Sequence, residues 1–330
     1  MLRSILNYIA KQYCLYKIYT LPRGLMIVRD VSVKSEVSSE VDVHVLNDTV
    51  YYDIIKTGEF GLRDGYCSGK WTSSNLERVM ILLMDPLNKN HFIKDLLHSI
   101  KTDTIDEYYL DSTYRANSTG FWVSPEDTLE SSIKNKLDYI QSKLDIQSED
   151  RVLDIGCGYG MMTNYLYNLT KAKFTGITIY TEELKYAKAN ADKEITFLKQ
   201  SYGEMVGQYD KILSIELYNK YDIESGYFEA ISNNLKIGGI ALIQVSVSMG
   251  DISCIVDTIS KIDNLRLIGM EYFDGSNYEK TYREWNNRLK ENCKSVDHKI
   301  LRKYEYYFNT CVGAYHNNSS VSCVFVLKKK

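Results

Sequence analysis

This sequence has few prolines, a small net charge and no long apolar run. Its 330 residues include 3 prolines, and 40 Lys and Arg residues nearly balance 43 Asp and Glu residues, for a net charge of −3. The near-neutral balance gives no electrostatic reason to expect nucleic acid as a partner. No apolar stretch approaches the roughly 20 residues needed to span a bilayer. At 330 residues the chain is long enough for two domains, or for one large domain with a smaller one, and its 44% of hydrophobic residues is ordinary for a globular protein.

Cysteines with the spacing of a metal site are also lacking. The 7 Cys residues are scattered, odd in number and never spaced as CxxC. This pattern excludes the usual zinc-binding spacings and predicts reduced thiols, as in a cytoplasmic protein. We therefore expect no metal ligand set and a cytoplasmic location.

The N-terminal segment, residues 1–24, contains Lys and Arg but no acidic residue. Apolar and aromatic residues recur in it at helical spacing: Leu2, Ile5, Ile9, Tyr13 and Tyr16. One interpretation is a helix lying on an anionic membrane surface. The other, which we favour, is a helix packed on its own domain. Peripheral contact with a membrane is therefore left open.

Residues 25–60 contain two short β segments, "LMIVRDVSV" and "VDVHVL", followed by a helical stretch, "TVYYDIIKTG". The polar stretch "SIKTDTIDE" at 99–107 then separates two predicted domains, residues 1–105 and 106–330. A helix follows from residue 126, because five apolar residues share one of its faces: Leu129, Ile133, Leu137, Ile140 and Leu144.

Strand and helix signals alternate after this helix. Strands are predicted for "RVLDI", "KFTGITI", "ITFLK", "YDKILSI" and "GIALIQVSV", and helices for residues 161–170, 181–190 and about 224–235. Such alternation predicts an α/β fold, a doubly wound parallel sheet with helices on both faces. The final "VSCVFVLKKK" is predicted to be an antiparallel edge strand.

A glycine-rich turn follows the first strand of this unit, in "VLDIGCGYGMM". Gly156, Gly158 and Gly160 are spaced GxGxG, whereas the dinucleotide fingerprint is GxGxxG. Asp154 beside the turn repels a phosphate and attracts an ammonium group. S-adenosylmethionine carries an ammonium and a sulfonium and no phosphate, so the turn predicts this cofactor rather than NAD. The alternative is a turn with a purely structural role.

The next strand ends supply further candidate cofactor ligands. Glu183 follows the second strand and is expected to accept from ribose hydroxyls, while Gln200, Ser201 and Glu204 follow the third, near an adenine edge. Neighbouring residues at the same strand ends complete the predicted set: Cys157, Thr178, Ile179, Tyr202 and Ile215.

Four segments, "RVLDIGCGYG", "FTGITIYTEE", "YDKILSIE" and "LKIGGIALIQ", resemble the S-adenosylmethionine-dependent methyltransferases. Three more narrow the resemblance to the cyclopropane-fatty-acyl-phospholipid synthases: "GEFGLRDGYCSGKW", "NYEKTYREWNNRL" and "YEYYFNTCVGAYHNNSSVSCVFVL". The resemblance covers the chain from about residue 41, in matching order. It implies a seven-stranded class I, Rossmann-like methyltransferase domain joined to a smaller N-terminal α+β domain.

The resemblance also implies a reaction. In that family a methyl group passes from the sulfonium to a cis double bond of a phospholipid acyl chain, and the methyl loses a proton as the ring closes. Deprotonation needs a base, which the resemblance identifies as a bicarbonate held by a Cys, a Glu, a His and a Tyr. The expected partner is thus a phospholipid acyl chain or another small-molecule acceptor, and a homodimer is left open.

This sequence differs from the family at most of those four positions. Thr119 in "NSTGFW" stands for the Cys, Asn219 in "YNK" for the Glu and Gln244 in "LIQVS" for the His, while Tyr278 is kept. These four residues are the candidate catalytic set. Amides keep the hydrogen-bonding shape but accept no proton near neutral pH, so a bound bicarbonate is left open. Lys220 and Ser246 stand for a further His and an Ile of the family.

Two family segments have no full counterpart. The H-Y-D-x-G-N motif corresponds to "HSIKTD", in which His98 alone matches, and the F-P-G-G-x-L-P-S segment is absent. In its place "MGDISCIVDTISKIDNLRL" predicts a short helix and, by resemblance, a substrate pocket that is more open or differently shaped.

Three hypotheses follow. The first is a lipid methyltransferase of cyclopropane-synthase type, and the second is a methyltransferase with a different acceptor or outcome. Methyl transfer itself needs mainly alignment and desolvation and does not require the lost base. The third is a catalytically idle protein that binds the cofactor, a lipid or a protein partner.

Overall fold

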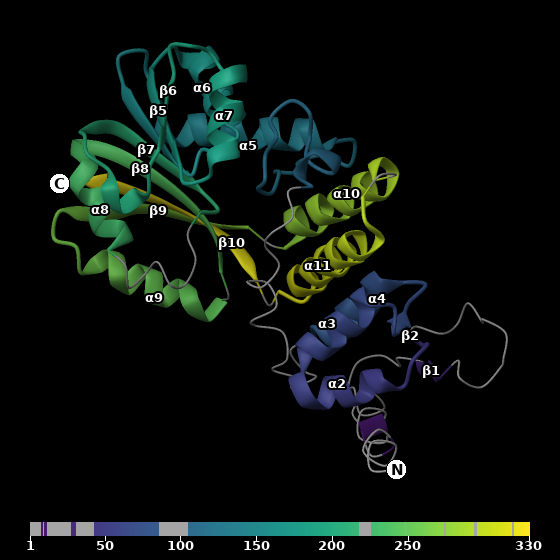
Figure 1. Cartoon of the computed structure of the whole chain (residues 1–330). Helices are drawn as coiled ribbons and strands as arrows, with labels where there is room; N and C mark the ends of the chain where they lie inside the picture. The colour runs from purple at the N-terminus through teal and green to yellow at the C-terminus, as the bar shows by residue number, and fades with distance from the viewer. Residues whose placement is uncertain are drawn as a thin grey trace. The chain divides into compact units, whose positions relative to one another are not determined.

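The structure is a computed structural model of the whole chain (Figure 1). It describes residues 8, 10, 11, 28–30, 43–85, 105–217, 226–247, 249–273, 275–293, 296–318 and 320–330. Most of the predicted N-terminal helix and most of the polar stretch at 99–107 lie outside these residues.

The chain divides into two compact units. The small unit comprises Met1–Tyr109 with Tyr278–Ser319, and the large unit comprises Leu110–Asn277 with Ser320–Lys330. The predicted domain division at residue 105 stays a prediction. The compact units differ from it because most of α10 (Ser276–Asn292) and all of α11 (His298–His316) group with the N-terminal elements.

The small unit combines short strands with helices. Its sheet has the order β1-β2-β3, with β1 parallel to β2 and β3 antiparallel to it. The elements are β1 (Val28–Asp30), β2 (Val43–Val45), α2 (Thr49–Thr57), α3 (Glu59–Cys67), β3 (Trp71–Thr72), α4 (Leu76–Leu83) and η3 (Asp106–Tyr108), followed by α10 and α11. The predicted β segments and the helix "TVYYDIIKTG" match β1, β2 and α2, whereas α3 was not predicted.

Aromatic side chains form the centre of the small unit. Trp71 is 1% exposed, and its ring centroid lies 4.9 Å from that of Tyr66. Tyr306 of α11 lies 5.7 Å from Tyr66. Arg302 stacks on Tyr66 at 3.8 Å and donates to the Tyr66 and Trp71 carbonyls. The motif "GEFGLRDGYCSGKW" is thus a packing surface for α11 within this unit.

The large unit has a sheet of seven strands in the order β6-β5-β4-β7-β8-β10-β9. Its elements are α5 (Leu129–Leu144), β4 (Arg151–Ile155), α6 (Met161–Thr170), β5 (Lys173–Thr178), α7 (Thr181–Asn190), β6 (Thr196–Lys199), η4 (Tyr202–Glu204), β7 (Tyr209–Ile215), α8 (Tyr227–Asn234), β8 (Leu235–Val247), α9 (Met249–Ser260), β9 (Leu265–Phe273) and β10 (Val321–Lys329). This is the predicted class I methyltransferase fold, and that prediction is confirmed.

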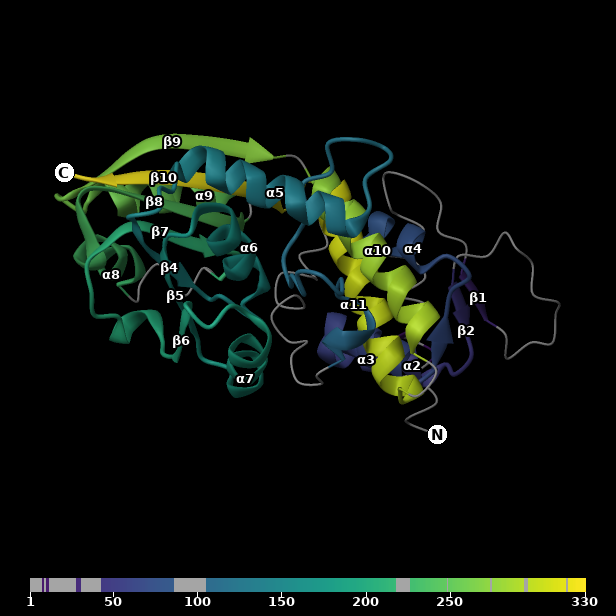
Figure 2. The ribbon, with the colours of Figure 1, turned by 90° about the horizontal axis from the view of Figure 1, so that it is seen from above.

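Helices cover both faces of the large sheet (Figure 1). The crossovers β4-α6-β5 and β5-α7-β6 run one way across the sheet, and β7-α8-β8 runs the other way. Because parallel crossovers are right-handed, α6 and α7 lie on one face and α8 on the opposite face. Helix α5 packs against α6 and β8 (Figure 2), and its five predicted core residues are all at most 1% exposed: Leu129, Ile133, Leu137, Ile140 and Leu144.

The last strand was predicted to be an antiparallel edge strand. β10 is antiparallel, but it pairs with β8 on one side and β9 on the other, so the edge position was wrong. The edge strand on this side of the sheet is β9, which begins at the end of the predicted short-helix segment and was not predicted as a strand. Its alternating burial pattern is typical of an edge with one solvated face.

Candidate active site

The predicted cofactor residues lie together at the carboxyl ends of the parallel strands. Strand order reverses between β4 and β7, and in an open α/β sheet ligands bind at such a switch point. Asp154 near the end of β4 is paired with Gly176 of β5 and Leu213 of β7, and Ile215 at the end of β7 is paired with Gln244 of β8.

The glycine turn is held to the neighbouring strand by its backbone. The N–H groups of Gly156 and Cys157 both donate to the Ile177 carbonyl, at 2.9 and 3.0 Å, and Gly160 N donates to the Cys157 carbonyl at 3.0 Å. Cys157 itself is 3% exposed, and burial raises the pKa of its thiol. Cys157 is therefore a neutral structural residue of the turn.

Gly158 and Gly160 have different reasons to be glycine. Both have positive φ, 55° and 76°. A Cβ atom at Gly160 would lie 2.7 Å from Ala187 Cβ and 2.8 Å from Phe197, so this glycine permits close packing. A Cβ atom at Gly158 would meet nothing within 4 Å. The turn is therefore packed on its Gly160 side and open at Gly158, as a ligand cradle requires.

Asp154 is buried, with 2% of its surface exposed, and accepts a hydrogen bond from Thr163 Oγ1 of α6. Burial raises the pKa of Asp154 to about 6, although the Thr163 bond opposes the shift. A buried carboxylate of this kind gains stability from a nearby cation, such as the ammonium of S-adenosylmethionine. The residues of the turn therefore fit this cofactor.

The next two strand ends are organised by local hydrogen bonds. Thr178 Oγ1 donates to Glu183 Oε2 at 2.5 Å, which fixes the carboxylate at the start of α7. Ser201 caps η4 through the Glu204 carboxylate, at 2.8 Å from its hydroxyl, so Glu204 has a structural role there. Gln200 N donates to the Thr178 carbonyl, and Ile179 is 53% exposed. Tyr202 begins η4, with its ring against that of Tyr227.

Two of the four predicted catalytic residues converge on an acid that the sequence analysis missed. Glu216 follows β7, and its Oε1 accepts from Thr119 N at 3.2 Å and from Gln244 Nε2 at 3.0 Å. Thr119 and Gln244 are buried, at 2% and 1% exposed. The one available sequence signal was an acidic residue at a strand end, in "YDKILSIE".

The other two predicted catalytic residues are Asn219 and Tyr278. Asn219 and Lys220 lie outside the described residues. Tyr278 is 1% exposed in α10 of the small unit, where its ring stacks on Tyr315 at 4.0 Å. Its role in catalysis stays a prediction.

A buried lysine lies beside the Glu216 cluster. Lys136 of α5 is 0% exposed, and its Nζ donates to Ser118 Oγ at 2.6 Å. Burial lowers the pKa of Lys136 to about 8, while the charges of Glu216 and Asp111 oppose the shift. A buried lysine therefore interacts electrostatically with the Glu216 carboxylate.

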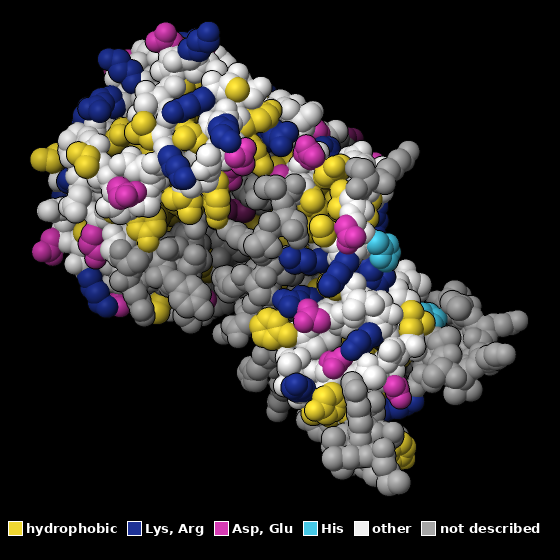
Figure 3. Space-filling view, viewed as in Figure 1, with side chains coloured by type: hydrophobic (Ala, Val, Ile, Leu, Met, Phe, Trp, Pro, Cys, Tyr) yellow, Lys and Arg dark blue, Asp and Glu magenta, His cyan; other side chains and the backbone are white. Residues whose placement is uncertain are grey.

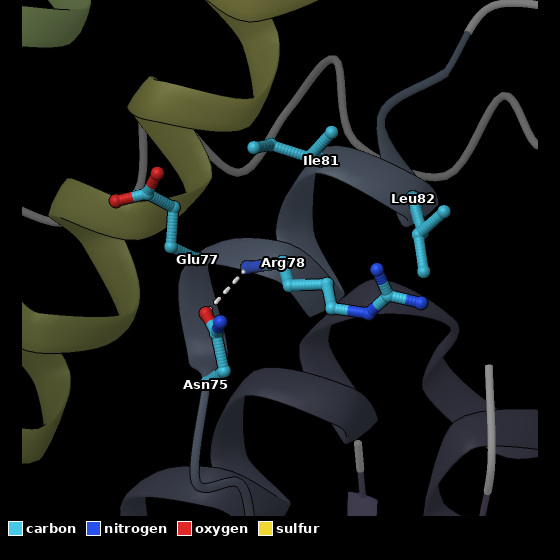
Figure 4. A pocket seen from close by; sticks show the side chains of 5 residues that line it. All are labelled: Asn75, Glu77, Arg78, Ile81 and Leu82. Carbon is cyan, nitrogen blue, oxygen red and sulfur yellow. Dashed lines mark hydrogen bonds between the residues drawn. The ribbon is translucent and has the colours of Figure 1, made fainter. Parts of the chain in front are cut away.

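A separate open pocket lies in the small unit, on α4 (Figure 4). Asn75 caps this helix by accepting from Arg78 N at 3.0 Å, and Glu77, Ile81 and Leu82 complete the lining. None of the predicted site residues lines it. In the described part of the chain, no group of three His, Cys, Asp or Glu side chains is placed to hold a metal ion.

The surface carries mixed charge. On the face of the large unit shown in Figure 3, Lys and Arg side chains are interspersed with Asp, Glu and hydrophobic side chains. None of the described helices is long and apolar enough to cross a membrane.

Known proteins match the chain in sequence and fold. The family model of mycolic acid cyclopropane synthetase matches residues 98–254. Cyclopropane-fatty-acyl-phospholipid synthase from Escherichia coli (strain K12) is 24% identical, over 84% of this chain and 85% of that protein. The cyclopropane synthase MmaA2 from Mycobacterium tuberculosis has a TM-score of 0.64 at 18% identity, over 69% of this chain and 94% of that one.

A coclaurine N-methyltransferase bound to N-methylheliamine and S-adenosylhomocysteine has a TM-score of 0.63 at 16% identity, over 83% of this chain and 99% of that one. The comparisons confirm the predicted resemblance to cyclopropane synthases and the predicted enzyme class, S-adenosylmethionine-dependent methyltransferase. They test neither the predicted site residues nor the acceptor.

Proposed function

We propose that this protein transfers a methyl group from S-adenosylmethionine to a double bond in an acyl chain of a phospholipid. The observation that carries the proposal is the turn at the end of β4. It follows the buried Asp154, is open at Gly158 and lies at the switch point of the sheet. The lipid acceptor is supported by the Escherichia coli cyclopropane-fatty-acyl-phospholipid synthase, whose similarity extends over 84% of this chain.

The residues at the ends of β4 and β5 each have a part in this function. S-adenosylmethionine supplies an electrophilic methyl group when it is bound. Asp154 attracts the ammonium group, and Glu183, held by Thr178, accepts from ribose hydroxyls. Gly158 allows the close approach of the cofactor to the backbone. Catalysis of the transfer then depends on alignment and on exclusion of water.

A second candidate is methyl transfer to a different acceptor, such as an amine. Thr119 and Gln244 carry no group that accepts a proton near neutral pH, which favours a reaction without ring closure. The fold similarity to a coclaurine N-methyltransferase is compatible with this candidate, because that fold accommodates more than one acceptor.

The test uses S-adenosylmethionine with a fully deuterated methyl group and vesicles of unsaturated phospholipid. We expect extracted lipid to gain one carbon together with two or three deuterium atoms. Two retained deuterium atoms mean that the methyl lost a proton and the ring closed, whereas three mean simple methyl transfer. The absence of labelled lipid, with S-adenosylhomocysteine still produced from an added amine, would contradict the lipid proposal. The Asp154→Ala variant serves as the background control.

A further inference from the structure

We infer that the Glu216 carboxylate is a built-in general base, which removes the proton from the transferred methyl group so that the ring closes without a bound bicarbonate. The inference rests on the proposed function and names a residue of the same site. Its evidence is the convergence of two distant chain segments on the Glu216 carboxylate.

Glu216 lies at the carboxyl end of β7, where the sheet order reverses. Its own backbone N–H donates to the Gln244 carbonyl at 2.9 Å, which continues the pairing of β7 with β8. The next residue, Leu217, packs against the cofactor turn, since a Cβ atom at Gly156 would lie 3.0 Å from Leu217 Cδ1. Glu216 is thus held beside the cofactor turn by its backbone bond to β8 and by the packing of Leu217.

The backbone of Glu216 has φ of 54°, in the left-handed region that glycine favours. A residue with a Cβ atom adopts this conformation at an energetic cost. Such outliers persist where the surrounding structure fixes them, and they concentrate at functional sites. Here the conformation lets the carboxylate reach both Thr119 N and Gln244 Nε2.

The Gln244 amide is oriented by its bond to Glu216. Nε2 donates to the carboxylate, and Oε1 is buried with no hydrogen-bond partner among the described residues. An unsatisfied carbonyl oxygen carries partial negative charge, which stabilises a nearby cation. Glu216 and Gln244 therefore place a carboxylate base beside a carbonyl oxygen that carries partial negative charge.

Bicarbonate does not fit this arrangement. Thr119 and Gln244 occupy two of the four positions that the family resemblance assigns to bicarbonate, and both donate to Glu216 instead. A second anion there would lose these donors and would lie against a carboxylate of like charge. The Glu216 carboxylate therefore takes the place that bicarbonate has in the family.

The step balances in atoms and electrons. The C–S bond breaks and leaves its electron pair on sulfur, while the π pair of the alkene forms the new C–C bond and leaves a carbocation. Glu216 then takes a proton from the new methyl group, and the C–H electron pair closes the ring. The proton passes from Glu216 to water, so the net products are cyclopropane, S-adenosylhomocysteine and a proton.

The experiment compares the wild type with Glu216→Gln, using the deuterated cofactor and unsaturated phospholipid vesicles in bicarbonate-free buffer. We expect the two-deuterium ring product to fall at least 100-fold in Glu216→Gln. Binding of S-adenosylhomocysteine, measured by calorimetry, should change less than threefold. The matched control is Glu229→Gln, since Glu229 is an exposed glutamate of α8 in the same unit.

A binding measurement supplies a readout independent of turnover. Glu216→Gly suits the positive φ and removes the carboxylate, so it leaves space beside Thr119 N and Gln244 Nε2. We expect ¹³C-labelled bicarbonate to show line broadening in NMR with Glu216→Gly and none with the wild type. Added bicarbonate should also restore ring formation to Glu216→Gly.

The outcomes separate the two proposals. A wild type that labels no lipid overturns the proposed function and this inference with it. A wild type that labels lipid but needs bicarbonate for ring closure overturns the inference alone. Equal ring formation by wild type and Glu216→Gln, or lipid that keeps all three deuterium atoms in the wild type, does the same.

Discussion

The glycine turn after β4 and the Glu216 cluster after β7 occupy neighbouring strand ends, yet they are built differently. The turn is one continuous segment from Asp154 to Gly160, fastened to β5 by its own backbone. The cluster joins Thr119, Glu216 and Gln244, which are far apart in the sequence. A local site keeps a signature that can be recognised, whereas an assembled site can change its chemistry one segment at a time.

Of the variants that test the difference between the turn and the cluster, Asp154→Ala should have the largest effect. Asp154→Ala should weaken S-adenosylhomocysteine binding more than 100-fold, because the cofactor ammonium loses its counter-charge. Calorimetry measures this, with exposed Asp263→Ala as the matched control. Unchanged affinity would refute the assignment of the turn.

Asp154→Asn should separate binding from stability. Burial raises the pKa of Asp154 from 3.8 to about 6, so the folded protein holds this proton more tightly than the unfolded chain does. Ionised Asp154 therefore lowers the free energy of unfolding above about pH 6, by about 3 kcal/mol. Asp154→Asn should gain up to this amount at neutral pH, and the gain should vanish as pH falls to about 4, while cofactor binding is lost.

The next effect distinguishes the two sides of the turn. Gly160→Ala should lower the free energy of unfolding by about 3 kcal/mol, since its Cβ atom would lie 2.7 Å from Ala187 Cβ. Gly158→Ala should cost about 1 kcal/mol, from its positive φ alone, but should weaken cofactor binding about tenfold. Denaturant titration and calorimetry on both variants measure the two effects. Equal losses of stability in Gly158→Ala and Gly160→Ala would show that the turn is packed at Gly158 as well.

The smallest effect concerns the cluster. Burial lowers the pKa of Lys136 from 10.5 to about 8, so the unfolded chain binds this proton more tightly than the folded protein does. The free energy of unfolding should therefore rise with pH between about 8 and 10.5, by about 1 kcal/mol over the first pH unit. Lys136→Met should remove this rise in denaturant titrations across that range. If the free energy of unfolding of Lys136→Met rose by the same amount, the rise would belong to another titrating group.

Much of the large unit could be predicted from its sequence. β4, α6, α7 and β7 begin and end at the predicted residues, because the apolar strand segments and the turns between them mark the limits of the helices. β9 was missed because its side chains alternate between partly buried and exposed, and its partner β10 is distant in the sequence. Register of that kind depends on tertiary pairing, which no local pattern specifies.

The candidate site shows the same limit. The glycine turn could be predicted because spacing, charge and strand context occur within one segment. Glu216 could not, because a lone acid after a strand is usually a solvated residue. Its importance comes from the Thr119 N–H and the Gln244 amide, which the fold brings to it.

The central position of β10 has a consequence for the order of synthesis. β8 and β9 leave the ribosome well before Val321–Lys329, yet β10 is the strand that joins them. Before β10 is synthesised, β9 has no strand of the sheet to pair with, and its backbone N–H and C=O groups stay solvated. The sheet therefore closes late, and a ribosome that stalls before residue 321 leaves an open β8 edge able to pair with another chain.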